Sequence, residues 1–298
     1  MAILLTGGAY AKTSQRIASL CREAKIPFLF ASRRGDSPPP EDTTTSGPNG
    51  ADAPAVRFDW TDGDTYANPF AYSFPTGDVI RAVYMVMPRV PEPDKHINSF
   101  IDYAAARGVK RFVLMAGTSA SLGGPGPGKV WQHMVEKGVE WAVCRPTWFM
   151  DNLSDGFHLK TIREEGTIYS CVRDAKVPFI SSFDVGGVAF AVLTQPESPN
   201  RDYRIVGPEL LTHDDVAARL STALGRPIRH VSMSPEDRLH HMTSTLKLPA
   251  PYAGFMVSLE KLAARGAEDY MDDTVEQLTG SKPVDLDSFI NQRKPIWT

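Results

Sequence analysis

The first half of the chain alternates short apolar runs with amphipathic stretches. The apolar runs have the length of buried strands, and the stretches between them carry apolar residues at helical spacing. This alternation is typical of an α/β fold, in which helices cover both faces of a doubly wound parallel sheet. The expected strands cover residues 3–5, 28–31, 56–58, 79–87, 111–116 and 140–144, and the expected helices cover 14–23, 97–106 and 130–136.

The second half of the chain has a different pattern. Helical stretches are mixed with short strands, and residues 232–273 are expected to be mostly helical. Thr212, followed closely by two aspartates, indicates a helix N-cap with an acidic first turn. We therefore expect a Rossmann-like cofactor domain over residues 1–150. A smaller mixed lobe for the substrate is expected over 151–298, with some of its segments returning to the first sheet.

A glycine turn follows the first predicted strand. Thr6, Gly7 and Gly8 break the apolar run, and Lys12 and Thr13 then open an amphipathic helix. Strand, glycine turn and helix N-terminus in this order indicate a dinucleotide site, because the helix end presents unpaired N–H groups and a partial positive charge to a pyrophosphate. The third glycine of the usual G-x-G-x-x-G pattern is replaced, so the motif is incomplete.

The second predicted strand ends in Ser32, Arg33 and Arg34. Dinucleotide folds use an acidic residue here to accept a hydrogen bond from the ribose 2′-hydroxyl, whereas arginine favours a 2′-phosphate. A guanidinium can grip phosphate and can also stack on adenine. We therefore expect NADP(H) rather than NAD(H); a solvated basic turn is the alternative. An exposed loop is expected over residues 37–54.

The other predicted strands also end in residues that could line such a ligand, because parallel strands share one carboxyl edge. Asp59 could accept a hydrogen bond from the adenine amino group, with Trp60 closing the pocket; the alternative for Asp59 is helix capping. Thr118 stands where many such enzymes place a catalytic hydroxyl. The further candidate cofactor contacts at this edge are Met87, Pro88, Ala116 and Pro146.

Composition narrows the class of partner. The 298 residues include 32 basic and 35 acidic side chains, and the net charge of −3 gives no electrostatic case for nucleic acid or an anionic membrane. No apolar run approaches the roughly 20 residues of a membrane helix. Three widely spaced cysteines without metal-ligand spacing indicate reduced thiols. A cytoplasmic protein with a small-molecule ligand and no metal is expected, with most histidines at the surface or at helix caps.

Several motifs, taken together, are characteristic of one group of proteins. They are ILLTGG at 3–8, KT at 12–13, IPF at 26–28, FDW at 58–60, GVKRFVL at 108–114, RPTWFMDN at 145–152, IYS at 168–170, VPFIS at 177–181, GPELLT at 207–212 and LGRPI at 224–228. The chain resembles the NmrA-like branch of the atypical short-chain dehydrogenase/reductases, and more narrowly fungal enzymes of the festuclavine and agroclavine dehydrogenase type. The resemblance implies a Rossmann fold, NADP(H) and reduction of a cyclic iminium in an indole alkaloid.

The segment after the sixth predicted strand supplies the candidate substrate contacts. Trp148, Phe149 and Met150 follow a rigid Arg-Pro pair, and such rings suit a flat aromatic or cationic ligand at the nicotinamide end. Ordinary packing between sheet and lobe is the alternative. Asp151 could add a cation-friendly wall. His133 is the histidine that the fold places near the reaction site, although a packed helix residue is the competing interpretation.

The Tyr-x-x-x-Lys pair of ordinary short-chain dehydrogenases is absent around Lys129 and His133. A ketone reductase must protonate an alkoxide, whereas an iminium becomes a neutral amine once hydride arrives. This difference favours an iminium, or its ring-opened aldehyde-amine, as the substrate. Two alternatives remain open on sequence. One is a non-redox cyclase of Pictet–Spengler or Mannich type that holds NADP as a scaffold, and the other is a dinucleotide-sensing regulator.

Overall fold

The computed structural model describes residues 1–35 and 53–298. Most of the loop expected over 37–54 therefore lies outside the described residues. The chain divides into two compact units. Unit 1 comprises Met1–Pro146 with Val185–Arg204, and unit 2 comprises Thr147–Asp184 with Ile205–Thr298.

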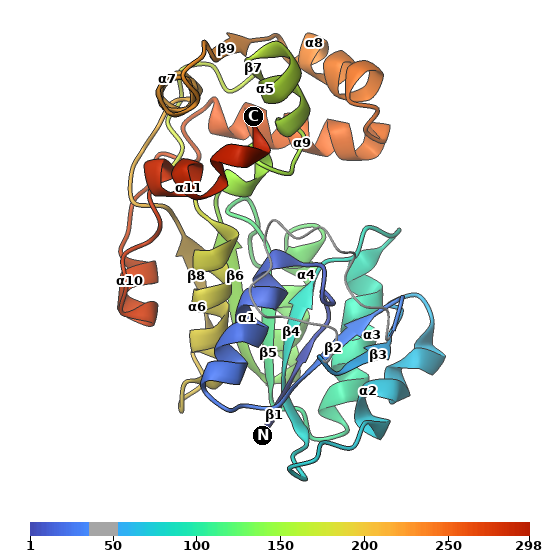
Figure 1. The fold of residues 1–298 in the computed structure, drawn as a ribbon. Coiled ribbons are helices and arrows are strands. Elements are labelled where there is room, and N and C mark those ends of the chain that lie inside the picture. Colours follow the sequence, from blue (N-terminus) through green and yellow to red (C-terminus); the bar gives the residue numbers. More distant parts are fainter. Residues whose placement is uncertain (36–52) are drawn as a thin grey trace. The chain divides into compact units, whose positions relative to one another are not determined.

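Unit 1 is built on a seven-stranded sheet in the order β3-β2-β1-β4-β5-β6-β8 (Figure 1). Every neighbouring pair from β3 to β6 is parallel. The strand order reverses between β1 and β4, and this switch point is where doubly wound sheets bind ligands. The strands are β1 (Ala2–Leu5), β2 (Phe28–Ser32), β3 (Ala55–Arg57), β4 (Ile80–Val86), β5 (Arg111–Met115), β6 (Glu140–Pro146) and β8 (Arg201–Ile205).

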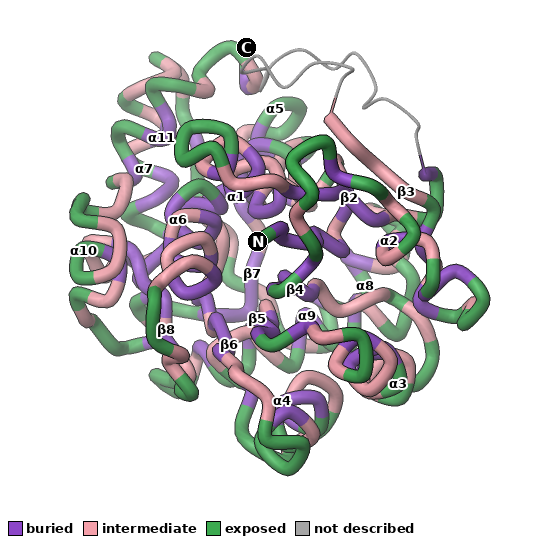
Figure 2. Tube along the Cα trace, turned by 90° about the horizontal axis from the view of Figure 1, so that it is seen from below, coloured by how far each residue is buried: buried purple, intermediate pink, exposed green. Residues whose placement is uncertain are grey.

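One face of this sheet is covered by α3 (Pro93–Ala105) and α4 (Pro127–Lys137). Alternate strand residues such as Leu4 and Met85 pack in the core beneath these helices. The opposite residues of the same strands are also buried, and the central strands therefore appear purple in Figure 2. Burial on both faces explains why the strands are apolar throughout instead of alternating.

The other face is covered by α1 (Lys12–Glu23) and α6 (Ser182–Thr194), which lie side by side (Figure 1). A Cβ on Gly186 of α6 would lie 2.6 Å from Cβ of Arg16 on α1, so glycine is required at this crossing. The Tyr84 hydroxyl of β4 donates a 3.0 Å hydrogen bond to Thr13 Oγ1 of α1. This bond ties the start of α1 to the centre of the sheet.

Unit 2 contains a two-stranded parallel sheet of β7 (Thr167–Ser170) and β9 (Arg229–Ser232). Its core gathers apolar side chains from the surrounding helices, and the indole N–H of Trp297 donates to the Leu153 carbonyl at 2.7 Å. The helices are α5 (Leu159–Glu165), α7 (His213–Leu224), α8 (Pro235–His240), α9 (Ala250–Ala263), α10 (Thr274–Thr279) and α11 (Leu286–Arg293).

Several element ends differ from those expected. Helices α3 and α4 begin three to four residues before their predicted starts, each at a proline (Pro93 and Pro127). Proline suits a first helical turn because its fixed φ is helical and its missing N–H would be unpaired there. Strand β6 continues through Pro146 instead of ending at Cys144. The helical prediction over 232–273 is right through Ala263 and wrong beyond it.

The helix N-cap predicted at Thr212 is confirmed. The Thr212 hydroxyl accepts from the Asp215 N–H at 3.1 Å, and the Asp215 carboxylate accepts from the Thr212 N–H at 2.9 Å, which is a complete capping box. No helix within residues 1–35 and 53–298 combines the length and apolar character needed to cross a membrane.

Candidate functional site

The glycine turn between β1 and α1 lies at the carboxyl edge of the sheet. Thr6 is held there by its hydroxyl, which donates to the Tyr84 carbonyl at 3.0 Å. Gly8 has φ of +65°, a conformation that glycine adopts without the steric cost other residues meet. A Cβ on Gly8 would lie 2.8 Å from Ser32 Cβ, so the turn is packed directly against the end of β2.

Gly7 permits an equally close approach to α1. A Cβ at this position would lie 2.6 Å from Ser14 Oγ and 2.9 Å from Ala11 Cβ. Ser14 Oγ is buried and has no hydrogen-bond partner among the described residues. Ala11 occupies the N-cap position and has no side-chain oxygen to cap the helix. The first turn of α1 therefore combines an uncapped helix N-terminus with an orphaned hydroxyl, an arrangement that could accept a phosphate.

Lys12 and Thr13 occupy the first turn of α1, as the motif predicts. Lys12 is half-buried, and Thr13 is buried beneath the Tyr84 hydroxyl. The Gln15 side-chain N–H donates to the Ala9 carbonyl at 2.6 Å, which anchors the turn on the helix. Two hydrogen bonds between neutral groups thus hold the glycine turn and the start of α1 in place, one from Tyr84 to Thr13 and one from Gln15 to Ala9.

The end of β2 carries two exposed guanidinium groups beside the turn. Arg33 and Arg34 are exposed, whereas Ser32 is half-buried against Gly8. Arg34 Cζ lies 5.1 Å from the centroid of the Tyr10 ring, a cation–π contact. The arginines that the sequence predicts for a 2′-phosphate therefore lie at the same edge as the glycine turn.

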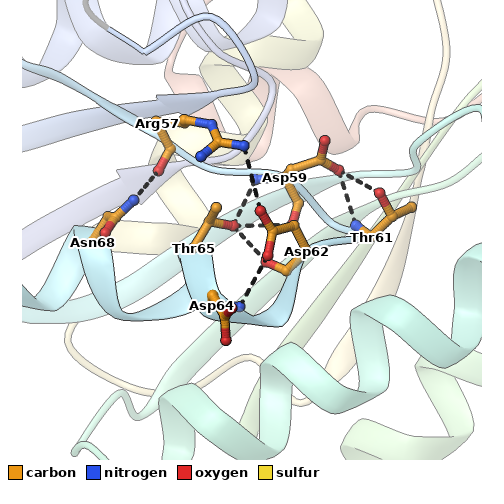
Figure 3. A network of polar contacts seen from close by, with 7 residues as sticks. All are labelled: Arg57, Asp59, Thr61, Asp62, Asp64, Thr65 and Asn68. Carbon is orange, nitrogen blue, oxygen red and sulfur yellow. Dashed lines mark hydrogen bonds and ion pairs between the residues drawn. The ribbon is translucent and has the colours of Figure 1, made fainter.

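The polar network after β3 surrounds Asp59 (Figure 3). Asp59 Oδ1 accepts from both the N–H and the hydroxyl of Thr61, at 2.9 and 2.8 Å. These bonds hold the pKa of the Asp59 carboxyl below its usual range, with a further lowering from the charges of Arg33 and Arg57. Helix capping, the alternative for Asp59, falls instead to Asp62, which accepts from the Asp64 N–H. Asp59 is therefore an anionic acceptor near Arg33.

Trp60 does not lie open at this edge. Its ring is 7% exposed and packs edge-on against Phe58 and Phe100, at centroid distances of 4.9 and 5.5 Å. The position predicted for closing an adenine pocket is therefore occupied by a core side chain. The aromatic cluster stabilises the end of β3, and this accounts for Trp60 without a ligand.

Arg145, which the sequence analysis treated only as part of a rigid Arg-Pro pair, links the segment after β5 to β8. Its guanidinium donates to the Thr118 carbonyl at 2.6 Å and to Asp202 at 2.5 Å. The Thr118 N–H in turn donates to the Pro146 carbonyl at 3.2 Å. Arg145 thus fixes the backbone that carries the Thr118 hydroxyl; its position before proline at a strand end was the available signal. The other predicted contacts, Met87, Pro88 and Ala116, are half-buried at the ends of β4 and β5.

His133 lies at the seam between two helices. Its Nε2 is 3.1 Å from Asp102 Oδ1 of α3, and Lys137 of α4 binds the same carboxylate at 2.7 Å. Lys129, one turn earlier on α4, binds Asp94 of α3 at 3.6 Å. These pairs follow the helix axes and link α3 to α4. The packed-helix interpretation of His133 describes this geometry, in which the ring is paired with a carboxylate of the neighbouring helix.

The predicted substrate segment lies in unit 2. Trp148 packs against two apolar clusters, Phe149 is half-buried, and Met150 is fully buried. Asp151 is 6% exposed, and both of its oxygens accept from Ser182, Oδ2 from the N–H at 2.8 Å and Oδ1 from the hydroxyl at 2.9 Å. Asp151 therefore caps the start of α6, and Met150 belongs to the core.

Unit 2 also contains a buried cluster of four histidines that the sequence analysis placed at the surface or at caps. None of His158, His213 and His241 lies at the surface, since they are 5%, 2% and 9% exposed. The prediction of cap positions is confirmed for His158, the N-cap of α5, and for His241, the C-cap of α8. His213 lies 5.3 Å from His230 and 6.4 Å from His158 between ring centroids. Burial lowers the pKa of His158 well below its usual range and that of His213 to about 3, with Arg238 adding to both effects.

A buried ion pair lies beside these histidines. Arg238 and Glu260 are 0% and 1% exposed, and Arg238 Nε and Nη2 each lie 3.0 Å from Glu260 Oε1. Arg238 Nη1 is 3.1 Å from His241 Nδ1, and Glu260 Oε2 accepts from the Cys171 N–H at 2.7 Å. These contacts place one cation and one anion inside unit 2, and the two charges neutralise each other.

Three residues of unit 2 have the types of a hydrolytic triad. Ser170 Oγ lies 2.8 Å from His230 Nε2, and His230 Nδ1 lies 3.4 Å from Asp214 Oδ1. Ser170 is 1% exposed, however, and its Oγ accepts from the Val172 N–H at 3.3 Å. A nucleophile must reach its substrate, so this set joins β7, β9 and α7 and does not serve catalysis.

The parallel sheet with its switch point, the glycine turn and the uncapped helix define the class of dinucleotide-binding α/β enzymes. No family model matches the chain. It is 39% identical over its whole length to agroclavine dehydrogenase of Claviceps fusiformis, and 37% identical over its whole length to festuclavine dehydrogenase easG of Aspergillus fumigatus; it covers 99% of each. The chain therefore belongs to the agroclavine and festuclavine dehydrogenase family and is an oxidoreductase, as its motifs indicated.

A solved structure extends the comparison of the fold. Triphenylmethane reductase of Citrobacter sp., complexed with NADP(H), matches with a TM-score of 0.76 at 17% identity. The match covers 98% of this chain and 100% of that chain. At this identity the likeness concerns the fold, which is the Rossmann-like arrangement predicted from the alternating strands and helices.

Proposed function

We propose that the chain is an NADPH-dependent reductase that acts on a cyclic iminium, or on its ring-opened aldehyde-amine, in indole alkaloid biosynthesis. The observation that carries the cofactor part is the cradle at Gly7, where a Cβ would meet Ser14 and Ala11. The names of the full-length relatives support the alkaloid part. Unit 1 is assigned to the cofactor, and unit 2 contributes the substrate lobe.

The residues at the carboxyl edge suit the successive parts of NADP(H). The N–H groups at the start of α1, with Ser14 Oγ and Lys12, would hold the pyrophosphate. Arg33 would pair with the 2′-phosphate, where an acidic residue would repel it. The Asp59 carboxylate already accepts two hydrogen bonds from Thr61 at Oδ1. Its Oδ2 would accept a hydrogen bond from the adenine amino group. When bound, the cofactor supplies a hydride to the substrate.

The substrate class follows from the chemistry that the side chains can support. A cationic iminium is stabilised by aromatic rings, and Trp148 with Phe149 would supply them. Its reduction yields a neutral amine and needs no proton donor at the reacting carbon. If the aldehyde-amine form enters, its amine adds to the aldehyde and the resulting hydroxyl leaves as water to give the iminium; the Thr118 hydroxyl is the candidate proton donor to that leaving hydroxyl. In this proposal Asp151 and His133 stabilise the fold and do not take part in the reaction. The Asp151 carboxylate binds Ser182, and the His133 ring is paired with Asp102.

The decisive experiment follows deuterium from NADPH labelled at C4, on either face, into products formed from indole-derived cyclic iminium ions and their aldehyde-amines. Deuterium in the product with matching loss of NADPH supports the reductase. Turnover without loss of NADPH would contradict it and indicate ring closure. Binding of NADPH without turnover of any member of the panel would contradict it in favour of a dinucleotide sensor.

The 2′-phosphate assignment has its own test. Arg33→Ala is expected to raise the dissociation constant of NADPH about 10- to 100-fold, since hydrogen bonds to charged groups contribute about 1.5–3 kcal/mol. NADH lacks the 2′-phosphate and serves as the internal control, with a change of about twofold at most. Equal weakening of both nucleotides in a titration would remove the assignment.

A further inference from the structure

The two arginines that follow β2 do not have the same surroundings. Arg34 lies over the Tyr10 ring at 5.1 Å, whereas Arg33 lies within electrostatic reach of the Asp59 carboxylate. Both are exposed, so each presents guanidinium surface to solvent. A pair of neighbouring cations with different partners is suited to two different tasks.

Tyr10 is itself held in place by the turn that carries it. The preceding residue, Ala9, has its carbonyl bonded to the Gln15 side chain at 2.6 Å, and Gly8 packs against Ser32 at the end of β2. Tyr10 is 36% exposed, so part of its surface is accessible to solvent at the carboxyl edge. The turn thus delivers an aromatic face to the strand end at which the adenosine of a dinucleotide binds.

A guanidinium fixed on one aromatic ring is prepared to stack on a second one. Its delocalised plane stacks on π-systems, and ordering the side chain beforehand reduces the entropy lost on binding. The adenine ring is common to NADPH and NADH, so a contact with adenine strengthens both nucleotides equally. A contact with the 2′-phosphate strengthens NADPH alone.

We propose that Tyr10 and Arg34 form a preordered platform for the adenine ring, while Arg33 alone reads the 2′-phosphate. This inference rests on the proposed binding of NADP(H) and adds a division of labour between the adjacent arginines. Arg34 is then an affinity residue for any adenine dinucleotide, and Tyr10 is its positioning residue.

The test measures dissociation constants by calorimetry for NADPH, NADH, adenosine 2′,5′-bisphosphate and adenosine 5′-diphosphate. Arg34→Ala is expected to weaken all four about 5- to 30-fold, the equivalent of about 1–2 kcal/mol. Tyr10→Ala is expected to weaken all four about threefold, Tyr10→Phe to restore the wild-type values, and the double variant to match Arg34→Ala. The control is Arg22→Ala, which removes the cation–π pair of Arg22 with Phe28, also at 5.1 Å, and should change no constant.

Selective weakening of NADPH and the bisphosphate by Arg34→Ala would overturn the division of labour. Additive effects of Tyr10→Ala and Arg34→Ala would overturn the platform, because independent contacts add and coupled ones do not. Failure of the wild-type chain to bind either dinucleotide would overturn the proposed function together with this inference. Normal wild-type binding with an unaffected Arg34→Ala variant would overturn the inference and leave the proposed function standing.

Discussion

The glycine turn of unit 1 and the Arg238 cluster of unit 2 are both rich in polar groups, but they differ in how those groups are satisfied. At the turn, Ser14 Oγ is buried with no partner among the described residues, and a helix starts at an alanine that cannot cap it. In unit 2, Arg238 has Glu260 and His241 as partners. A buried charge with its partner inside the fold is a structural element, whereas the proposed function assigns a ligand to the unpaired polar groups of the glycine turn.

The comparison also explains which titratable residues are poor catalytic candidates. The buried histidines of unit 2 have strongly perturbed pKa values, a property that often marks active sites. Here burial and the charge of Arg238 cause the shifts, and Ser170 and Glu260 lie inside the fold. The perturbed pKa values of these histidines therefore reflect packing in unit 2 and do not mark a catalytic site.

The largest expected effect comes from removing the anion of the buried pair. Glu260→Leu leaves the Arg238 charge without its counter-ion and should lower the free energy of unfolding by about 3–5 kcal/mol. Urea denaturation of the variant measures this loss. The paired replacement Arg238→Met with Glu260→Leu removes both charges and should recover most of the stability. A double variant no more stable than Glu260→Leu would show that the charge is not the cause.

Acid should destabilise unit 2 through its histidines. Their folded-state pKa values are lowered, to about 3 for His213, so the unfolded chain binds protons first as the pH falls below about 6.5. Stability is therefore complete above that pH. It should fall by up to about 1.4 kcal/mol per pH unit for each buried histidine, until the folded-state pKa is reached.

Denaturant melts between pH 7 and 4.5 measure that slope. His213→Leu should make it shallower by close to one proton, because His213 Nδ1 has no hydrogen-bond partner among residues 1–35 and 53–298 and an apolar replacement is compatible. His240→Asn, at an exposed position of α8, is the matched control and should leave the slope unchanged. If the unfolding free energy of the wild type and of His213→Leu depended on pH with the same slope, His213 would not contribute to the acid destabilisation.

Filling the phosphate cradle should affect binding more than folding. Gly7→Ala brings a methyl group within 2.9 Å of Ala11 Cβ and forces the turn away from α1. The dissociation constant of NADPH should rise about 100-fold, which corresponds to about 2.7 kcal/mol. Gly63→Ala is the control in the same unit, because a Cβ there meets nothing within 4 Å of the described residues. Equal NADPH affinity in the two variants would remove the cradle from the binding site.

The smallest expected effect is that of Ser14→Ala, which tests whether the Ser14 hydroxyl binds a ligand or stabilises the fold. Ser14→Ala removes a buried group without a partner in the described structure, so the free energy of unfolding should stay equal or rise by up to about 1 kcal/mol. NADPH binding should weaken several-fold in the same variant. Ser19→Ala, which removes an exposed hydroxyl of α1, should leave binding unchanged. Loss of stability with unchanged binding would assign Ser14 to the fold.

Local pattern was sufficient for the features that short segments control. The apolar runs predicted the strands from β1 to β6, and Thr212 predicted the capping box of α7, because hydrophobic period and capping chemistry act over a few residues. The glycine turn and its helix were likewise visible in the first fourteen residues. Full-length relatives later confirmed the family that the motifs indicated.

Tertiary structure decided the role of each polar side chain, because its partners come from distant segments. Asp151 and His133 have the residue types of catalytic groups, yet Ser182 and Asp102 occupy their polar atoms. The sequence by itself determined the α/β architecture and the location of the glycine turn. Packing determined that the buried Arg238 contacts His241, and that Ser14 lies beneath Gly7 with an unsatisfied hydroxyl. Periodicity reports which face of an element is apolar, but long-range contacts choose the partners.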